Sequence, residues 1–154
     1  MSTKIVFIGN MLGGDDGIGP FLYNELKDDP DLKDFELLEL GVIGFDLISY
    51  VEYDDKLIIV DAVHSENNVG EVILIDENDL SQELSLVSQH DFGVEQTAAI
   101  LRAYAKDLKR IVVVGIKVKQ TNAFTDKLSD ELMNKMQTIR AEVVDLIIQA
   151  ATEG

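Results

Sequence analysis

Short apolar runs alternate with helix-like patterns along this chain. Nearly continuous apolar runs at residues 5–8, 56–60 and 111–116 are typical of strands buried on both faces of a parallel sheet. Residues 35–40 and 71–75 predict two further strands, the second of them at a sheet edge. Strands that alternate with helices predict an α/β fold. We therefore expect a three-layer sandwich, in which a twisted, mostly parallel sheet carries helices on both faces.

The intervening segments supply the helices of this sandwich. Apolar residues recur at helical spacing after Gly19, over residues 47–51 and 94–101, and from Ser129 to Ala150, where Ser129 is a good N-cap. The polar connection at 76–92 is long for a compact domain, and such connections are often functional. With 154 residues, the chain is expected to form a single domain over residues 1–154.

Composition and charge exclude several classes of function. The net charge of −16 argues against a nucleic-acid partner, because such binding requires phosphate neutralisation. The chain has no apolar run long enough to span a membrane and no basic, then apolar, leader at its start, so we expect no membrane association and a cytoplasmic location. It has no cysteine, which excludes a thiolate metal site and a cysteine nucleophile.

The most distinctive stretch is the glycine-rich loop that follows the first predicted strand. Residues 9–20 read GNMLGGDDGIGP, and glycines allow tight turns and positive φ angles. Similar loops often cradle phosphate groups with their backbone N–H groups. Here Asp15 and Asp16 would repel a phosphate, so the loop suits a cation better than a nucleotide.

Other polar residues are expected at the same rim of the sheet. In open α/β sheets the ligand site lies outside the carboxyl ends of the strands. Asp61 ends a buried strand there, Asp16 follows another, and His90 lies in a loop that leads into a helix. Two carboxylates and an imidazole can bind a divalent metal such as Ni²⁺, Zn²⁺ or Fe²⁺. With three protein ligands, coordination positions would stay open for another group.

Simpler roles are open for each of these residues. Asp16 could cap the helix that begins near Gly17, and Asp61 could hydrogen-bond a neighbouring loop backbone. His90 could be a solvated loop residue, and His64 is interpreted as a surface or structural residue. A serine-histidine-aspartate triad is disfavoured, because the chain has no G-x-S-x-G nucleophile elbow.

Three motifs together resemble those of the [NiFe]-hydrogenase maturation endopeptidases. They are GNMLGGDDGIGP at 9–20, VDA at 60–62 and SQHDFGV at 88–94, and GVIGFDL at 41–47 falls where that family has a Gly-rich loop. The resemblance covers nearly the whole chain. It implies a twisted sheet between helices and an aspartyl-type endopeptidase activity. Such an enzyme removes the C-terminal tail of a hydrogenase large-subunit precursor after nickel has been inserted.

The resemblance also implies roles for individual residues. Asp16, Asp61 and His90 match the family positions that contact the nickel and that we expect to serve catalysis. The metal would arrive in the precursor, held by the precursor's own cysteines, so no permanently bound cofactor is expected. Val42 departs from the family, which often carries a hydroxyl residue at this point of the loop.

Two other classes of protein compete with this interpretation. A phospho-accepting receiver domain with Mg²⁺ also combines an acidic pair, an acceptor aspartate and a lysine, which Asp15, Asp16, Asp61 and Lys117 could mimic. Receivers place the acidic pair directly at the strand end, however, and do not explain the SQHDFGV segment. A dinucleotide-binding module is disfavoured because the loop lacks G-x-G-x-x-G and carries negative charge.

Overall fold

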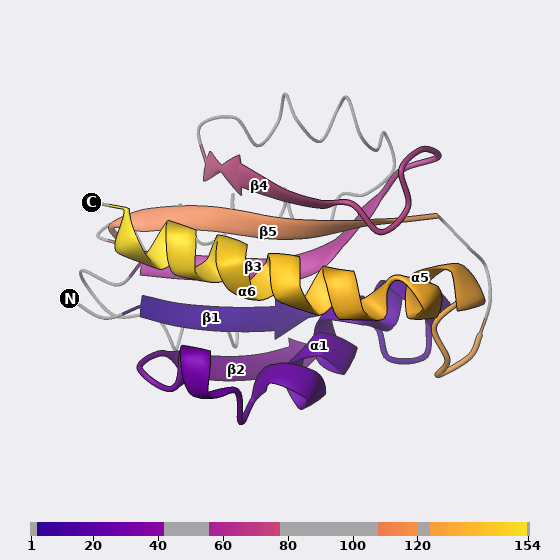
Figure 1. The fold of residues 1–154 in the computed structure, drawn as a ribbon, viewed down its shortest axis with the longest axis horizontal. Coiled ribbons are helices and arrows are strands. Elements are labelled where there is room, and N and C mark those ends of the chain that lie inside the picture. The colour runs from indigo at the N-terminus through magenta and orange to yellow at the C-terminus, as the bar shows by residue number, and fades with distance from the viewer. Residues whose placement is uncertain (1–2, 42–55, 78–107, 120–123, 154) are drawn as a thin grey trace.

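The computed structural model describes residues 3–41, 56–77, 108–119 and 124–153. Within these ranges, five strands form one sheet in the order β2-β1-β3-β5-β4 (Figure 1). The strands are β1 (Thr3–Ile8), β2 (Glu36–Gly41), β3 (Lys56–His64), β4 (Val72–Asp76) and β5 (Arg110–Val118). Strands β2, β1, β3 and β5 pair in parallel, and β4 pairs antiparallel with β5 at one edge. The predicted α/β class, mostly parallel sheet and edge position of β4 are confirmed.

The centre of the sheet is formed by the three apolar runs identified in the sequence. Strand β3 lies between β1 and β5, and almost all of its side chains are buried. The β1–β3 pairing ends at Phe7 and Val60, whereas β3 continues beside β5 as far as His64 and Val118. The prediction that this strand ends at Asp61 was therefore wrong. Pairing with β5 extends the strand beyond the acidic residue.

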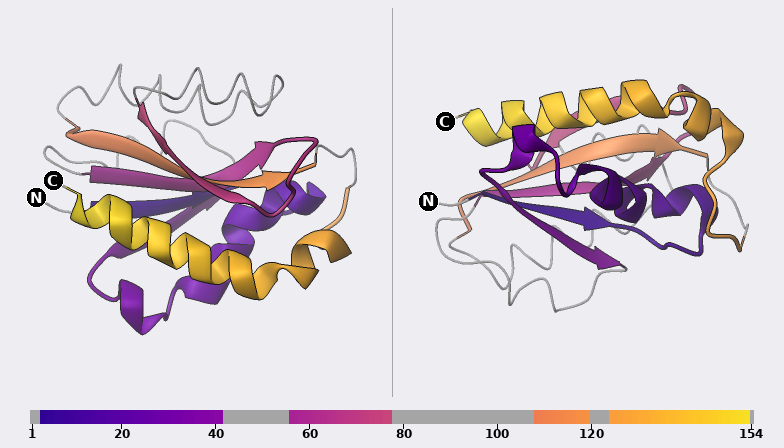
Figure 2. Two further views of the ribbon diagram at one scale, coloured as in Figure 1. Left: turned by 45° about the horizontal axis from the view of Figure 1, so that its top comes forward. Right: turned by 60° about the horizontal axis from the view of Figure 1, so that its bottom comes forward.

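Helices α1 (Ile18–Leu26) and α6 (Met136–Thr152) cover one face of the sheet (Figures 1 and 2). Their apolar residues pack against alternate residues of the central strands. This core includes Ile5, Phe7, Ile58, Val60, Ile18, Leu22, Ile139, Val143 and Ile147. The intervening strand residues form a second buried cluster toward the other face. Helices expected at 47–51 and 94–101 lie outside the described residues.

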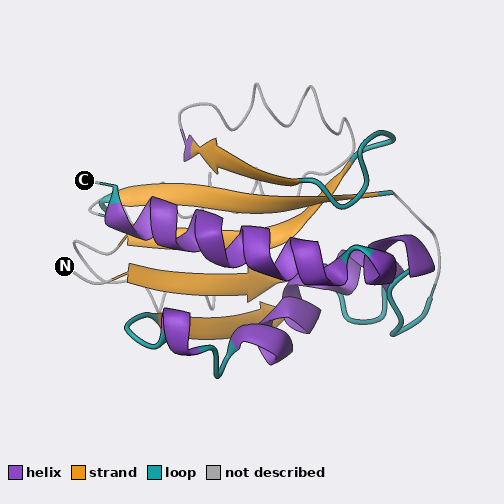
Figure 3. Cartoon of the chain, viewed as in Figure 1, coloured by secondary structure: helices purple, strands orange, loops and turns teal. Residues whose placement is uncertain are grey.

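The C-terminal helical segment is interrupted. Helix α5 (Asp130–Asn134) begins after Ser129, whose hydroxyl accepts a hydrogen bond from the Leu132 N–H, so the predicted N-cap is confirmed. Lys135, with φ −104° and ψ 2°, separates α5 from α6, whereas the sequence predicted one continuous helix. The ammonium of Lys135 donates to the Val69 carbonyl at 2.6 Å. This tertiary contact joins the break to the loop before β4. Figure 3 shows which of the described residues are helix, strand and loop.

The side chain of Lys56 connects the start of β3 to the end of α6 by hydrogen bonds. Its side chain is buried, and Nζ donates to the carbonyls of Ala150, Ala151 and Glu153 at 2.9, 3.3 and 2.5 Å. These carbonyls belong to the last helical turn and the residue after it, where no intrahelical donor is available. Burial lowers the pKa of Lys56, as does nearby Arg110 to a smaller extent, while Glu153 opposes the shift. The ammonium thus acts as a C-cap from a distant strand.

Two 3-10 helices complete the described elements. η1 (Gly14–Gly17) lies in the glycine-rich loop, and η2 (Pro30–Leu32) follows α1, where Asp29 caps it by accepting from the Asp31 N–H. No helix in the described ranges is long and apolar enough to cross a membrane.

Candidate active site

The glycine-rich loop folds back on itself directly after β1. The Asn10 N–H donates to the Asp16 carbonyl at 3.1 Å, and the Gly13 N–H donates to the Asn10 carbonyl at 3.0 Å. A Cβ at Gly9 would lie 2.4 Å from the Asp16 carbonyl oxygen, closer than any side chain can approach. Only Gly14 of the described loop glycines adopts a positive φ, 62°. The expectation that glycines allow positive φ angles in this loop is thus confirmed for Gly14. Gly9 is needed for a different reason, because it allows two backbone segments to come close together.

The loop is also fastened to the segment before α5. The Gly14 N–H donates to the Thr125 carbonyl at 2.9 Å, and the Thr125 N–H donates to the Leu12 carbonyl at 3.0 Å. The Asp15 carboxylate, which is buried, accepts a hydrogen bond from the Ser129 N–H at 2.6 Å. Figure 1 shows this segment beside the loop, at the end of the sheet toward which the parallel strands point. Asp15 therefore fixes the loop, which leaves Asp16 as the loop acid available for other chemistry.

Asp16 interacts with a histidine that the sequence analysis did not place in the site. The Nε2 atom of His64 lies 2.5 Å from Oδ1 of Asp16. A carboxylate oxygen can only accept here, so Nε2–H is the donor. The side chains of His64 and Asp16 are 16% and 31% exposed. The N-cap residues of η1 and α1 are Gly13 and Gly17, and neither helix has a side-chain cap among the described residues, so the helix-capping interpretation of Asp16 was wrong. His64 follows Asp61 by only three residues in the sequence, and this closeness to the predicted rim was the signal that could have revealed the contact.

Asp61 is the first residue of β3 beyond the part of the strand that pairs with β1. Asp61 is 9% exposed, and its Oδ1 accepts a hydrogen bond from the Ala62 N–H at 2.7 Å. Val60 is the last residue of β3 that pairs with β1, so the carboxylate supplies an acceptor just beyond that pairing. This bond runs to the adjacent strand residue. The alternative role of Asp61, a hydrogen bond to a neighbouring loop backbone, stays a prediction. Asp61 and Asp16 follow the ends of the β1–β3 ladder at the same carboxyl edge.

His90 lies outside the described residues, as do the SQHDFGV motif and residues 42–47. The three-residue set of Asp16, Asp61 and His90 therefore stays a prediction. Within the described ranges, no three His, Cys, Asp or Glu side chains form a group that could hold a metal ion. Asp16 and Asp61 follow the end of the β1–β3 pairing at one edge of the sheet, whereas the place of His90 stays a prediction.

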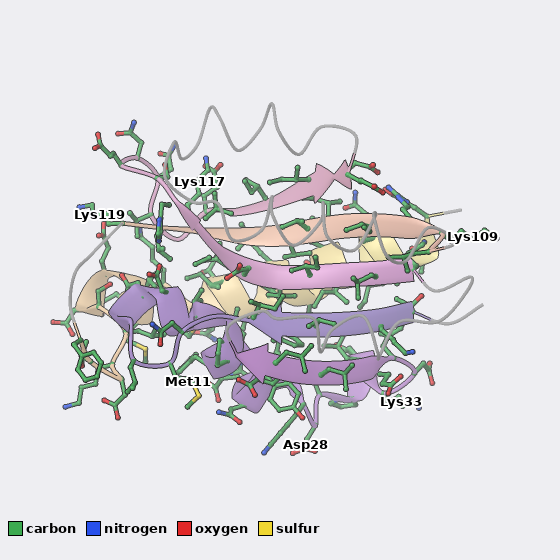
Figure 4. All side chains as sticks on the ribbon, turned by 180° about the vertical axis from the view of Figure 1, so that it is seen from behind. Met11, Asp28, Lys33, Lys109, Lys117 and Lys119 are labelled. Atoms are coloured by element: carbon green, nitrogen blue, oxygen red, sulfur yellow. The ribbon has the colours of Figure 1, made fainter. Side chains whose placement is uncertain are left out.

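Lys117 does not support the receiver-domain alternative. Its ammonium donates to Oε1 of Glu71 at 2.7 Å and forms an ion pair with this residue, which directly precedes β4. Figure 4 shows Lys117 and Lys119 at one end of β5 and Lys109 at the other. The receiver interpretation requires a lysine after the strand, whereas Lys117 lies within β5. Here it is paired with a carboxylate from the segment before β4.

Comparison with known proteins identifies the family. The family model for HycI, described as hydrogenase maturation protease, matches residues 21–146 of this chain. The chain belongs to the hydrogenase maturation protease family. It is thus an enzyme of the peptidase class, and the resemblance noted in the sequence is confirmed. The matched range includes Asp61 and His64 but begins after Asp16.

Two relatives are similar in sequence to most of this chain. The hydrogenase 2 maturation protease of Escherichia coli (strain K12) is 29% identical over 119 residues, which cover 75% of this chain and 73% of that protein. Protein FrxA of Pyrococcus furiosus is 29% identical over 145 residues, which cover 92% and 98%.

Solved structures of hydrogenase maturation proteases share the fold. The [NiFe] hydrogenase maturation protease HybD of Thermococcus kodakarensis has a TM-score of 0.75 and 25% identity, over 99% of this chain and 100% of that chain. The hydrogenase maturating endopeptidase HybD of E. coli has a TM-score of 0.73 and 21% identity, over 97% and 94%. The fold likeness, unlike the family match, includes the N-terminal glycine-rich loop region.

Proposed function

We propose that this protease removes the C-terminal extension of a [NiFe]-hydrogenase large-subunit precursor, and that it acts after nickel has been inserted. Asp16, Asp61 and His90 would contact the nickel that the precursor carries. The observation that carries the proposal is the position of Asp16 and Asp61 beside the ends of neighbouring parallel strands β1 and β3. Such an edge is where α/β folds bind ligands.

The ligand chemistry supports a metal that the substrate brings. The chain has no cysteine, and carboxylates with one imidazole form an open ligand set. A nickel ion held by cysteines of the precursor would supply the soft ligands that this chain lacks. Contact through the nickel would also act as a checkpoint, because a precursor without nickel offers nothing for the carboxylates to bind.

The proposed reaction is hydrolysis of one peptide bond. Docking on the nickel would hold the scissile bond beside Asp16 and Asp61. A water molecule, deprotonated by a carboxylate or activated at the nickel, attacks the carbonyl carbon. The carbon–nitrogen bond then breaks, the new chain end becomes a carboxylate, and the released tail takes a proton on its amine. No covalent intermediate with the enzyme is required.

Exposed apolar side chains beside the loop suit a polypeptide substrate. Met11 and Leu12 are 57% and 49% exposed, and Phe124, which precedes the loop-bound Thr125, is 83% exposed. Large apolar side chains gathered on an otherwise acidic protein are typical of protein-binding surfaces. Their attachment to the loop that carries Asp16 supports a contact with the precursor chain.

The test uses nickel-loaded and nickel-free precursor as substrates. We expect a shortened large subunit only from the loaded precursor, and no product when Asp16 or His90 is replaced by alanine. The control is Asp28→Ala, which removes an exposed acid at the end of α1 (Figure 4) and should cleave normally. Equal cleavage of both precursors, or normal cleavage by Asp16→Ala, would refute the proposal.

A further inference from the structure

The side chain of Asp16 is held by a partner from another strand. Its loop is fixed through backbone bonds, such as the one from Asn10 N–H to the Asp16 carbonyl, but these bonds leave the carboxylate free to rotate. The 2.5 Å contact from His64 Nε2 to Oδ1 removes that freedom. A carboxylate has two oxygens, so Oδ2 retains its lone pairs for a ligand. With 31% of its side chain exposed, Asp16 stays accessible to one.

The residue that holds Asp16 stands on a rigid support. His64 pairs with Val118 in the β3–β5 ladder, and the next residue, Ser65, donates its N–H to the Val118 carbonyl at 2.8 Å. Asp61 lies three residues earlier on the same strand. One strand therefore carries Asp61 itself and the group that orients Asp16, so the relative position of the two carboxylates depends on β3.

We propose that His64 is a positioning residue that orients the Asp16 carboxylate for metal contact, an inference that rests on the proposed function. Without the Nε2–H donor, the carboxylate must lose its rotational freedom when the metal binds, which costs free energy. Groups that hydrogen-bond to a metal ligand typically contribute 10–100-fold to metal affinity or activity. His64 is assigned no contact with the nickel or the scissile bond, because its Nε2 is engaged by Asp16 and its Nδ1 is buried.

The experiment compares two replacements of His64 in the full chain. His64→Leu removes the donor and keeps the bulk, whereas His64→Gln retains a nitrogen donor near the position of Nε2. Ser65→Ala is the control, because the Ser65 hydroxyl donates to the Asn67 carbonyl and not to the site. Urea unfolding checks that each variant folds. Cd²⁺ binding to the enzyme alone is measured by calorimetry, and KM and kcat are measured with nickel-loaded precursor.

We expect His64→Leu to weaken Cd²⁺ binding and raise KM by about 10-fold or more, with kcat less affected. His64→Gln should recover most of the affinity. In an Asp16→Asn background the leucine change should have no further effect, because the two residues act as a unit. Cd²⁺ affinity that is unchanged or tighter in His64→Leu would overturn the proposal, as would wild-type protein that binds no Cd²⁺. A wild type that binds Cd²⁺ but cleaves no precursor would instead refute the proposed function.

Discussion

Replacing Lys56 with methionine should lower the stability of the protein without changing its chemistry. The methionine keeps the buried apolar stem but removes the ammonium from the carbonyls of Ala150, Ala151 and Glu153. The Ala150 bond is buried, whereas the other two are part-buried, where water can replace the lost donor. An unsatisfied buried carbonyl costs about 1–3 kcal/mol. The lost cation at a helix C-terminus adds about 0.3–1 kcal/mol.

Together these costs come to about 1–4 kcal/mol. Because the ammonium no longer has to be buried, we expect the stability to fall by less than the upper limit, by about 2–3 kcal/mol. Urea unfolding at neutral pH measures it, and the melting temperature should fall by roughly 4–12 °C. Lys109→Met is the matched control, because Lys109 is exposed near the same end of the sheet and should change stability by less than about 0.5 kcal/mol. Equal effects of the two variants would refute the reasoning. Cleavage at low temperature should persist, because Lys56 begins β3 whereas Asp61 and His64 lie toward its other end.

Two other variants test the loop and its surroundings. Gly19→Ala should destabilise the protein by about 2 kcal/mol or more and impair cleavage. The reason is that a Cβ would lie 2.0 Å from the Ile8 carbonyl oxygen and push α1 away from β1. A variant that unfolds at the same urea concentration as wild type would contradict this. Phe124→Ser should raise KM for the precursor by about 3–10-fold and leave stability within about 0.5 kcal/mol. The control is Met133→Ser, which also replaces an exposed apolar side chain, on α5, and should leave KM unaltered.

Much of the sheet was predictable because its signal is local. The apolar runs of β1, β3 and β5 mark strands buried on both faces, and parallel strands bring their carboxyl ends to one edge. That logic placed Asp16 and Asp61 at the same rim. The over-run of β3 beyond Asp61 was missed because pairing with β5, not composition, decides where the strand ends.

The contacts of individual side chains could not be predicted, because they join distant parts of the chain. The bond between His64 and Asp16 requires the glycine-rich loop to curl back, and the bond from Ser129 to Asp15 requires α5 to arrive beside it. The break at Lys135 also depends on a distant partner, the Val69 carbonyl. Helical periodicity through this region is regular, so the sequence alone predicts no interruption.

The attachment of the glycine-rich loop to Thr125 and Ser129 has a consequence for when the enzyme becomes competent. Asp15 and the residue that holds it, Ser129, are 114 residues apart in the chain. A nascent chain therefore lacks the anchors of the loop until residues 125–129 have left the ribosome. A fragment that stops before Thr125 would carry Asp16 on an unanchored loop.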